Sequence, residues 1–81
     1  MENTLHDVLT AASGLCYDST SMALDIICET LFYDHGILAT WAGRSIYINN
    51  KRAASIKTTR EPIEGGSVIC IYEYFVLREV K

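Results

Sequence analysis

The spacing of the apolar residues changes at Gly36, and this change divides the chain into a helical part and a strand part. Before Gly36, apolar residues twice repeat at i, i+3, i+4 and i+7, which places them on one face of a helix. The repeats are Leu5, Val8, Leu9, Ala12 and Leu24, Ile27, Cys28, Leu31. The sequence predicts an α+β fold, with two N-terminal helices packed on a small, mainly antiparallel β-sheet and residues 1–81 forming a single domain.

The second predicted helix has suitable residues at both ends. Residues 18–21 offer several side chains that cap a helix N-terminus, and Gly36 is the residue type that most often ends a helix. A second apolar stripe runs along the same helix. It consists of Met22, Ile26 and Tyr33. This stripe predicts that the helix is buried on more than one side.

Beyond Gly36, short runs of β-branched and aromatic residues favour strands. Two such runs, 37–42 and 45–48, are separated by Gly43 and Arg44, which suit a tight hairpin. Asn49 and Asn50 mark the next turn. Segment 51–60 is compatible with a short helix or a strand. Glu61-Pro62 and Gly65-Gly66 then indicate a break. Segment 67–80 predicts a long strand that is central in the sheet or forms a dimer.

Composition narrows the class of protein. The chain has 81 residues, 49% of them hydrophobic, and lacks the run of roughly 20 apolar residues that a membrane-spanning helix needs. Its polar start, Met1–Thr4, has no signal-peptide character, and three cysteines at irregular spacing make a poor disulfide framework. We therefore expect a cytoplasmic protein, in the host cell cytoplasm if phage-encoded, with no membrane contact. A domain this small often dimerises, so we also expect a homodimer.

Charge is distributed very unevenly along the chain. Residues 1–34 contain six acidic residues and no Lys or Arg, whereas residues 35–60 contain five basic residues and no acid. Three interpretations remain open. The two regions attract each other across the fold, or the basic stretch binds nucleic acid, or the acidic region binds a protein partner. The candidate partner-binding residues are Asp18, Asp25, Glu29 and Asp34, and the candidate nucleic-acid-binding residues are Arg44, Lys51, Arg52, Lys57 and Arg60.

The residue patterns that usually carry catalysis or bind metals are missing from the sequence. Histidines and cysteines are scattered, without the paired spacing of a zinc site. Cys28 lies two helical turns before His35, roughly 10 Å away by helical rise, too far for a direct hydrogen bond. We therefore expect no enzyme, no catalytic residue, no metal and no cofactor. A small Cys-dependent or zinc protein is the least favoured alternative.

Part of the chain resembles the dimerisation region of the Mor family of phage middle-operon transcription activators. In that family an apolar helix leads into a Gly-Gly-x-x-[Ile/Val]-Tyr-[Ile/Val]-Pro-[Lys/Arg] motif. Here 24–31 resembles the helix and 41–52 resembles the motif, with Ala42 replacing a glycine and Asn49 replacing the proline. The resemblance implies a dimer and phage or mobile-element ancestry. It stops before the family's DNA-reading helix-turn-helix, where this sequence has the strand-like 67–80.

The sequence leads to one preferred function and one main alternative. The preferred function is a non-enzymatic protein-interaction module, such as a phage or mobile-element protein that binds and inhibits a host or defence complex in the manner of an anti-CRISPR protein. The alternative is a Mor-like DNA-binding transcription regulator that uses the basic 44–60 stretch. Aromatic residues dominate many interfaces, so the predicted dimer anchors are Trp41, Tyr47, Tyr72 and Tyr74.

Overall fold

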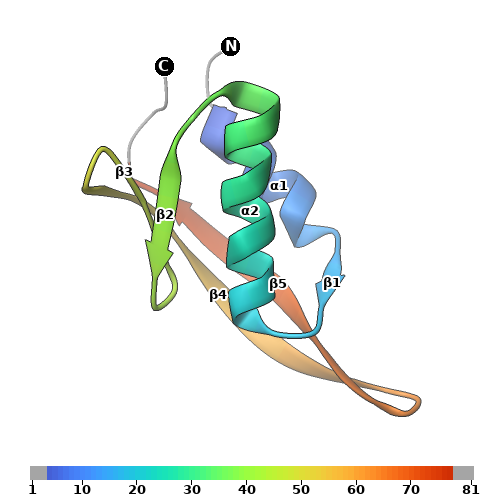
Figure 1. The fold of residues 1–81 in the computed structure, drawn as a ribbon. Coiled ribbons are helices and arrows are strands. Elements are labelled where there is room, and N and C mark those ends of the chain that lie inside the picture. The colour runs from blue at the N-terminus through green and yellow to red at the C-terminus, as the bar shows by residue number, and fades with distance from the viewer. Residues whose placement is uncertain (1–3, 78–81) are drawn as a thin grey trace.

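Two helices lie on one face of a curled antiparallel sheet (Figure 1). The computed structural model describes residues 4–77. The elements are α1 (Thr4–Ser13), β1 (Cys16–Tyr17), α2 (Thr20–His35), β2 (Ala39–Ala42), β3 (Ser45–Ile48), β4 (Lys51–Ile63) and β5 (Gly66–Val76). The five strands are ordered β1-β5-β4-β3-β2, and each neighbouring pair is antiparallel. The predicted α+β class with two N-terminal helices is confirmed.

Helix α2 begins and ends where its sequence predicts. The Ser19 hydroxyl accepts the Met22 backbone N–H at 3.1 Å, which satisfies one of the free donors of the first turn. At the other end Gly36 adopts a left-handed backbone, with φ of 68°, and donates its N–H to the Phe32 carbonyl at 2.9 Å. The chain turns there into β2.

The ambiguous segment 51–60 is a strand. It forms most of β4, which pairs with β3 on one side and with β5 on the other. The turn before it contains Asn49 and Asn50, which both have positive φ, at 56° and 63°. Such angles belong to the tight turns that join antiparallel strands, and asparagine tolerates them at low cost. Pairing with β3 and β5 therefore makes this segment a strand, although its local residue preferences are mixed.

The predicted break at Glu61-Pro62 is wrong, because β4 continues to Ile63. Ile63 and Gly66 flank a two-residue turn and form its hydrogen-bonded pair, so the next pair, Pro62 with Ser67, is not hydrogen-bonded. The proline nitrogen therefore points away from β5, where no ladder bond needs its missing N–H. The predicted last strand is confirmed as β5, which lies between β4 and the two-residue β1, and its expected continuation to residue 80 lies outside the described residues beyond Leu77.

Strand β1 has only two residues, and the sequence gives no sign of it. Cys16 pairs with Cys70 and Tyr17 with Ile69, which adds β1 to the outer edge of β5. Two residues show no period, so only the structure reveals this strand. Its effect is to tie the connection between the helices to the sheet.

The core lies between α2 and the inner face of the sheet, with α1 closing one side. Leu24, Ile27 and Leu31 of α2 are fully buried, as their spacing predicts. The second stripe is different, because Met22, Ile26 and Tyr33 are exposed. The prediction that α2 is buried on more than one side is therefore wrong for the chain alone. Within residues 4–77, the sheet and α1 bury one face of α2, and no other element covers the opposite face.

Candidate functional site

The outward face of α2 carries large apolar side chains. Tyr33 is 77% exposed, and Leu38, in the connection to β2, is 75% exposed. Met22, Ile26 and Phe32 are also exposed on this helix. Scattered surface hydrophobics are normal, but a contiguous apolar face with polar residues around it is typical of an interaction site. We call these five residues the α2 surface.

A groove of about 510 Å³ lies between α2 and β2, alongside the α2 surface. We call it the β2 groove. It is lined by Asp25, Cys28, Glu29, Phe32, Tyr33, Leu38, Ala39, Thr40 and Trp41. Its lining combines apolar and aromatic side chains with two carboxylates, and β2 forms its far wall. That combination resembles the makeup of binding grooves, in which apolar contacts give affinity and a few polar groups set orientation.

A hydrogen bond fixes the two walls of the β2 groove to each other. The Trp41 indole N–H of β2 donates to the Asp25 carboxylate of α2 at 2.7 Å. A carboxylate acceptor makes this bond stronger than one between neutral groups. Since Trp41 also packs against the core, the bond holds β2 at a defined distance from α2.

Cys28, which lines this groove, is held as a thiol. Burial, and then the nearby Asp25 carboxylate, raise the pKa of the Cys28 thiol to about 11. A reactive cysteine needs the opposite shift, since the thiolate is the nucleophile. Cys28 therefore contributes a small half-buried apolar group to the groove, as its position in the helical apolar repeat indicates.

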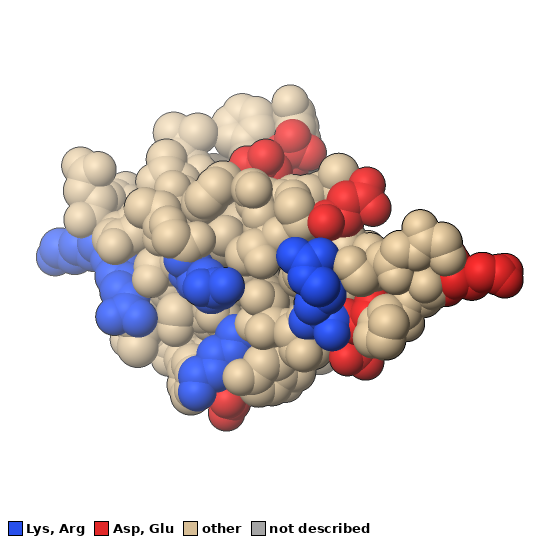
Figure 2. Space-filling view, turned by 90° about the horizontal axis from the view of Figure 1, so that it is seen from below, with Lys and Arg blue, Asp and Glu red and all other residues tan. Residues whose placement is uncertain are grey.

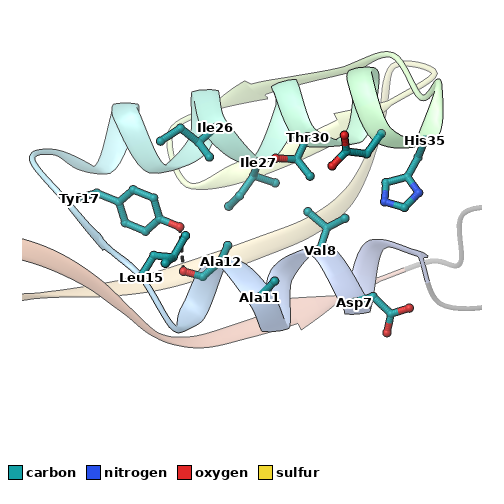
Figure 3. Close-up of a pocket in the computed structure, with 11 residues that line it drawn as sticks. Asp7, Val8, Ala11, Ala12, Leu15, Tyr17, Ile26, Ile27, Thr30 and His35 are labelled. Atoms are coloured by element: carbon teal, nitrogen blue, oxygen red, sulfur yellow. Dashed lines mark hydrogen bonds between the residues drawn. The ribbon is translucent and has the colours of Figure 1, made fainter.

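A second hollow, of about 260 Å³, lies between the two helices on the other side of α2 (Figure 3). Val8, Ala11 and Ala12 of α1 lie opposite Ile27 and Thr30 of α2. At one end the Tyr17 hydroxyl donates to the Ala12 carbonyl at 2.8 Å, and burial raises the pKa of this phenol. The hydroxyl is thereby satisfied within the chain, so this hollow is a mostly apolar furrow beside the α2 surface.

The structure brings together two of the four predicted partner-binding acids. Asp25 and Glu29 lie one helical turn apart and both line the β2 groove. Asp18 precedes α2 and is exposed, and Asp34 lines the hollow between the helices. The predicted acidic site is therefore split, with its groove half formed by Asp25 and Glu29.

The basic residues gather on another face. Figure 2 shows the Lys and Arg side chains spread over the underside of the molecule. Among residues 4–77 these are Arg44 in the β2–β3 turn and Lys51, Arg52, Lys57 and Arg60 on β4. Three guanidinium groups are held by hydroxyls: Arg44 Nε by Thr58 (3.4 Å), Arg52 Nε by Ser45 (3.1 Å) and Arg60 Nη1 by Ser67 (2.9 Å). Hydroxyl partners position these groups and leave their charge unneutralised.

Acidic helices and basic strands do not pair with each other. Within residues 4–77, one ion pair is present, between Lys57 and Glu73 at 3.5 Å, and it joins two strands. Lys57 also lies 5.3 Å from the centre of the Phe75 ring. The described residues therefore show no ion pair that would support attraction between the two charged regions across the fold.

The four predicted dimer anchors do not form one surface. Trp41 is bonded to Asp25, and the Tyr74 hydroxyl bonds Thr10 Oγ1 at 2.6 Å and His6 Nδ1 at 2.9 Å, so both aromatics are tied to helices. Tyr72 is well exposed, and Tyr47 is half-buried. Dimerisation stays a prediction.

Phe32, Tyr33 and Leu38 were not among the site residues predicted from the sequence. The sequence carries a signal for Tyr33, which belongs to the second apolar stripe, but none for Phe32 or Leu38. The spacing of the stripe predicts burial, since apolar spacing shows which residues share a face and not whether that face has a partner.

Comparison with protein-family models, with curated proteins and with solved structures gave no match. The resemblance to the Mor family therefore stays a prediction. Among residues 4–77, no cluster of His, Cys, Asp and Glu has the arrangement of a metal site. In the same part of the chain, neither helix is long and apolar enough to cross a membrane.

Proposed function

We propose that this protein is a non-enzymatic interaction module that binds a protein partner through the α2 surface and the β2 groove. One observation carries the proposal. The face of α2 opposite the core is apolar and exposed, and it borders a groove that contains Asp25 and Glu29. An isolated soluble domain gains nothing from exposing such residues, whereas an interface uses them as its buried centre.

The composition of the site also suits protein recognition. Tyr33, Phe32 and Trp41 are aromatic, and aromatic residues are enriched among those that dominate binding energy. Trp41 is fixed by its bond to Asp25, so part of the site is already ordered before binding. The finer prediction, a phage-encoded inhibitor of a host or defence complex, depends on the Mor-family resemblance. In that proposal the α2 surface would inhibit the host or defence complex by occupying a binding site on it.

Affinity capture with matched variants tests the proposal. Tyr33→Glu and Leu38→Glu place charges in the α2 surface, whereas Ile63→Glu places one at the exposed end of β4, away from it. We expect a partner that is retained by the unchanged protein and by Ile63→Glu and is lost by the other two. Retention by all three variants, each with an unchanged circular dichroism spectrum, would contradict the proposal.

A second candidate function is nucleic-acid binding by the basic face. It is favoured by the guanidinium groups of Arg44, Arg52 and Arg60, which are held by hydroxyls rather than by carboxylates. Fluorescence anisotropy on duplex and single strands tests it. Binding that weakens steeply with salt and is lost in Lys51→Ser/Arg52→Ser would support a regulator. Absence of binding at low salt would exclude this function.

A further inference from the structure

Among residues 4–77, no strand pairs with the outer edge of β2, which lies along the β2 groove. β2 is the last strand of the sheet, so β3 covers one of its edges. Ala42 and Ser45 flank a two-residue turn, which makes them a hydrogen-bonded pair, and such pairs alternate with non-bonded pairs along an antiparallel ladder. The backbone N–H and C=O groups of Ala39 and Trp41 therefore point away from β3, toward the open edge.

The sequence of β2 does not discourage further pairing. Sheet edges are commonly protected by proline, lysine or an inward-pointing charge. β2 reads Ala39-Thr40-Trp41-Ala42 and has none of these. By contrast, the part of β4 that extends past β3 carries Pro62, which has no N–H to offer to another strand. The edge of β2 also borders the β2 groove.

We propose that the β2 groove binds an extended segment of a partner protein that carries Lys or Arg, and that this segment pairs with β2 as a sixth strand of the sheet. The inference rests on the proposed function and specifies the partner's conformation and charge. Main-chain bonds to Ala39 and Trp41 would supply part of the affinity, and alternate side chains would supply the specificity.

The walls of the groove determine which side chains fit. Every second side chain of an added strand points toward α2, on the same side as Trp41. There it meets the exposed apolar groups of Phe32 and Leu38 and the carboxylates of Asp25 and Glu29. Helix α2 contains no Lys or Arg that could neutralise these acids. An apolar residue two positions from a basic residue would therefore complement the groove.

A second copy of the chain complements the groove less well. In a symmetric pair, the β2 strands of two copies would lie side by side and each groove would face its own duplicate. Asp25 and Glu29 of both copies would then approach one another, and like charges brought together across an interface are destabilising. The charge of the groove thus favours a different, basic partner.

Selection from a library of short random peptides on the immobilised protein provides the test. We expect the selected peptides to alternate apolar residues with others, to contain Lys or Arg, and to lose binding when alternate backbone nitrogens are methylated. For a synthetic copy of one selected peptide, Asp25→Asn with Glu29→Gln should weaken binding by about tenfold, since charge complementarity is lost. Asn at position 25 still accepts the Trp41 bond, so the wall stays in place.

A backbone variant separates strand pairing from other modes. Ala39→Pro removes one outward N–H at the first residue of β2, where proline is tolerated, and should weaken the peptide by about tenfold. Ala42→Ser is the control, because Ala42 is on the same strand but does not line the β2 groove and its backbone pairs with Ser45, and it should have no effect. Unfolding curves of all variants show whether the fold is kept.

Different failures have different meanings. Peptides with helical spacing that are lost on Tyr33→Glu and unaffected by Ala39→Pro would overturn strand pairing and leave the α2 surface as a protein-binding site. Selection of no peptide at all would overturn strand pairing alone, because partner capture tests the proposed function separately. Peptides unaffected by every α2 and β2 variant would contradict both.

Discussion

Trp41 donates its indole N–H to the Asp25 carboxylate at 2.7 Å, and this bond joins the edge strand β2 to helix α2. We predict that Asp25→Ala lowers the free energy of unfolding by about 1 kcal/mol, since the bond is at the surface and leaves the indole N–H able to find water. Asp25→Asn should cost less, because the amide oxygen can still accept. Urea unfolding followed by the fluorescence of Trp41, the single tryptophan, measures both. Equal losses in the two variants would show that the bond contributes little.

Ile26 and Ile27 are adjacent but lie on different sides of α2. Ile27 is 1% exposed and Ile26 is 37% exposed. We predict that Ile27→Ala lowers the free energy of unfolding by about 3 kcal/mol, through lost burial and an unfilled cavity. Ile26→Ala should lower it by under about 1 kcal/mol.

This pair of variants also tests whether the α2 surface is free in solution. Chemical denaturation at several protein concentrations gives both free energies. A large, concentration-dependent loss in Ile26→Ala would show that the second stripe is buried between copies of the chain, which would favour the predicted homodimer.

Cys16 and Cys70 are direct partners across β1 and β5, with their sulfurs 3.7 Å apart. We predict that hydrogen peroxide converts them to a disulfide. The peroxide oxidises one thiol to a sulfenic acid with release of water, and the other thiol displaces a second water to form the S–S bond. Closing so long a loop raises the free energy of unfolding by at most about 4 kcal/mol.

Intact-mass measurement and thermal unfolding, with and without dithiothreitol, test this disulfide. Cys28→Ser should leave the oxidation unchanged, whereas Cys70→Ser should abolish it. A disulfide that involves Cys28, or a cross-link between chains, would contradict the observed strand pairing.

The pKa of Cys28, raised to about 11, predicts a slow reaction with iodoacetamide near neutral pH. Its rate should increase with pH up to that value, as the thiolate forms. The folded state holds this proton more tightly than the unfolded state, so the contribution to stability is complete below pH 8 and is lost as the pH rises toward 11. Mass spectrometry of peptides after timed alkylation follows Cys28. Complete labelling at pH 7 while the protein remains folded would show that its thiol is activated instead.

Much of the fold was predictable because its signals are local. Helical spacing placed Leu24 and Leu31 in the core, and Gly36 marked the end of α2. The turn at Asn49 and Asn50 was equally clear, since few residues accept a left-handed backbone. Segment 51–60 was ambiguous because its strand state depends on partners distant in sequence. β1 is too short to show any period.

The site was less predictable than the fold. Asp25 and Glu29 were identified from the charge distribution, but nothing in the sequence separates them from Asp18 and Asp34, which lie elsewhere. Tyr33 was assigned to the core because apolar spacing does not reveal whether a helix face is covered. The open edge of β2 depends on strand order, which local patterns do not specify.

Site-specific photo-crosslinking tests the central claim most directly. A photoreactive phenylalanine analogue would replace Tyr33 on α2 or Tyr72 on β5, which are both strongly exposed, at 77% and 62%. In a lysate of cells that contain the partner, we predict a discrete crosslinked product from position 33 and none from position 72. Crosslinking from position 72 alone would place the interface on the sheet and would contradict a protein-binding role for the α2 surface.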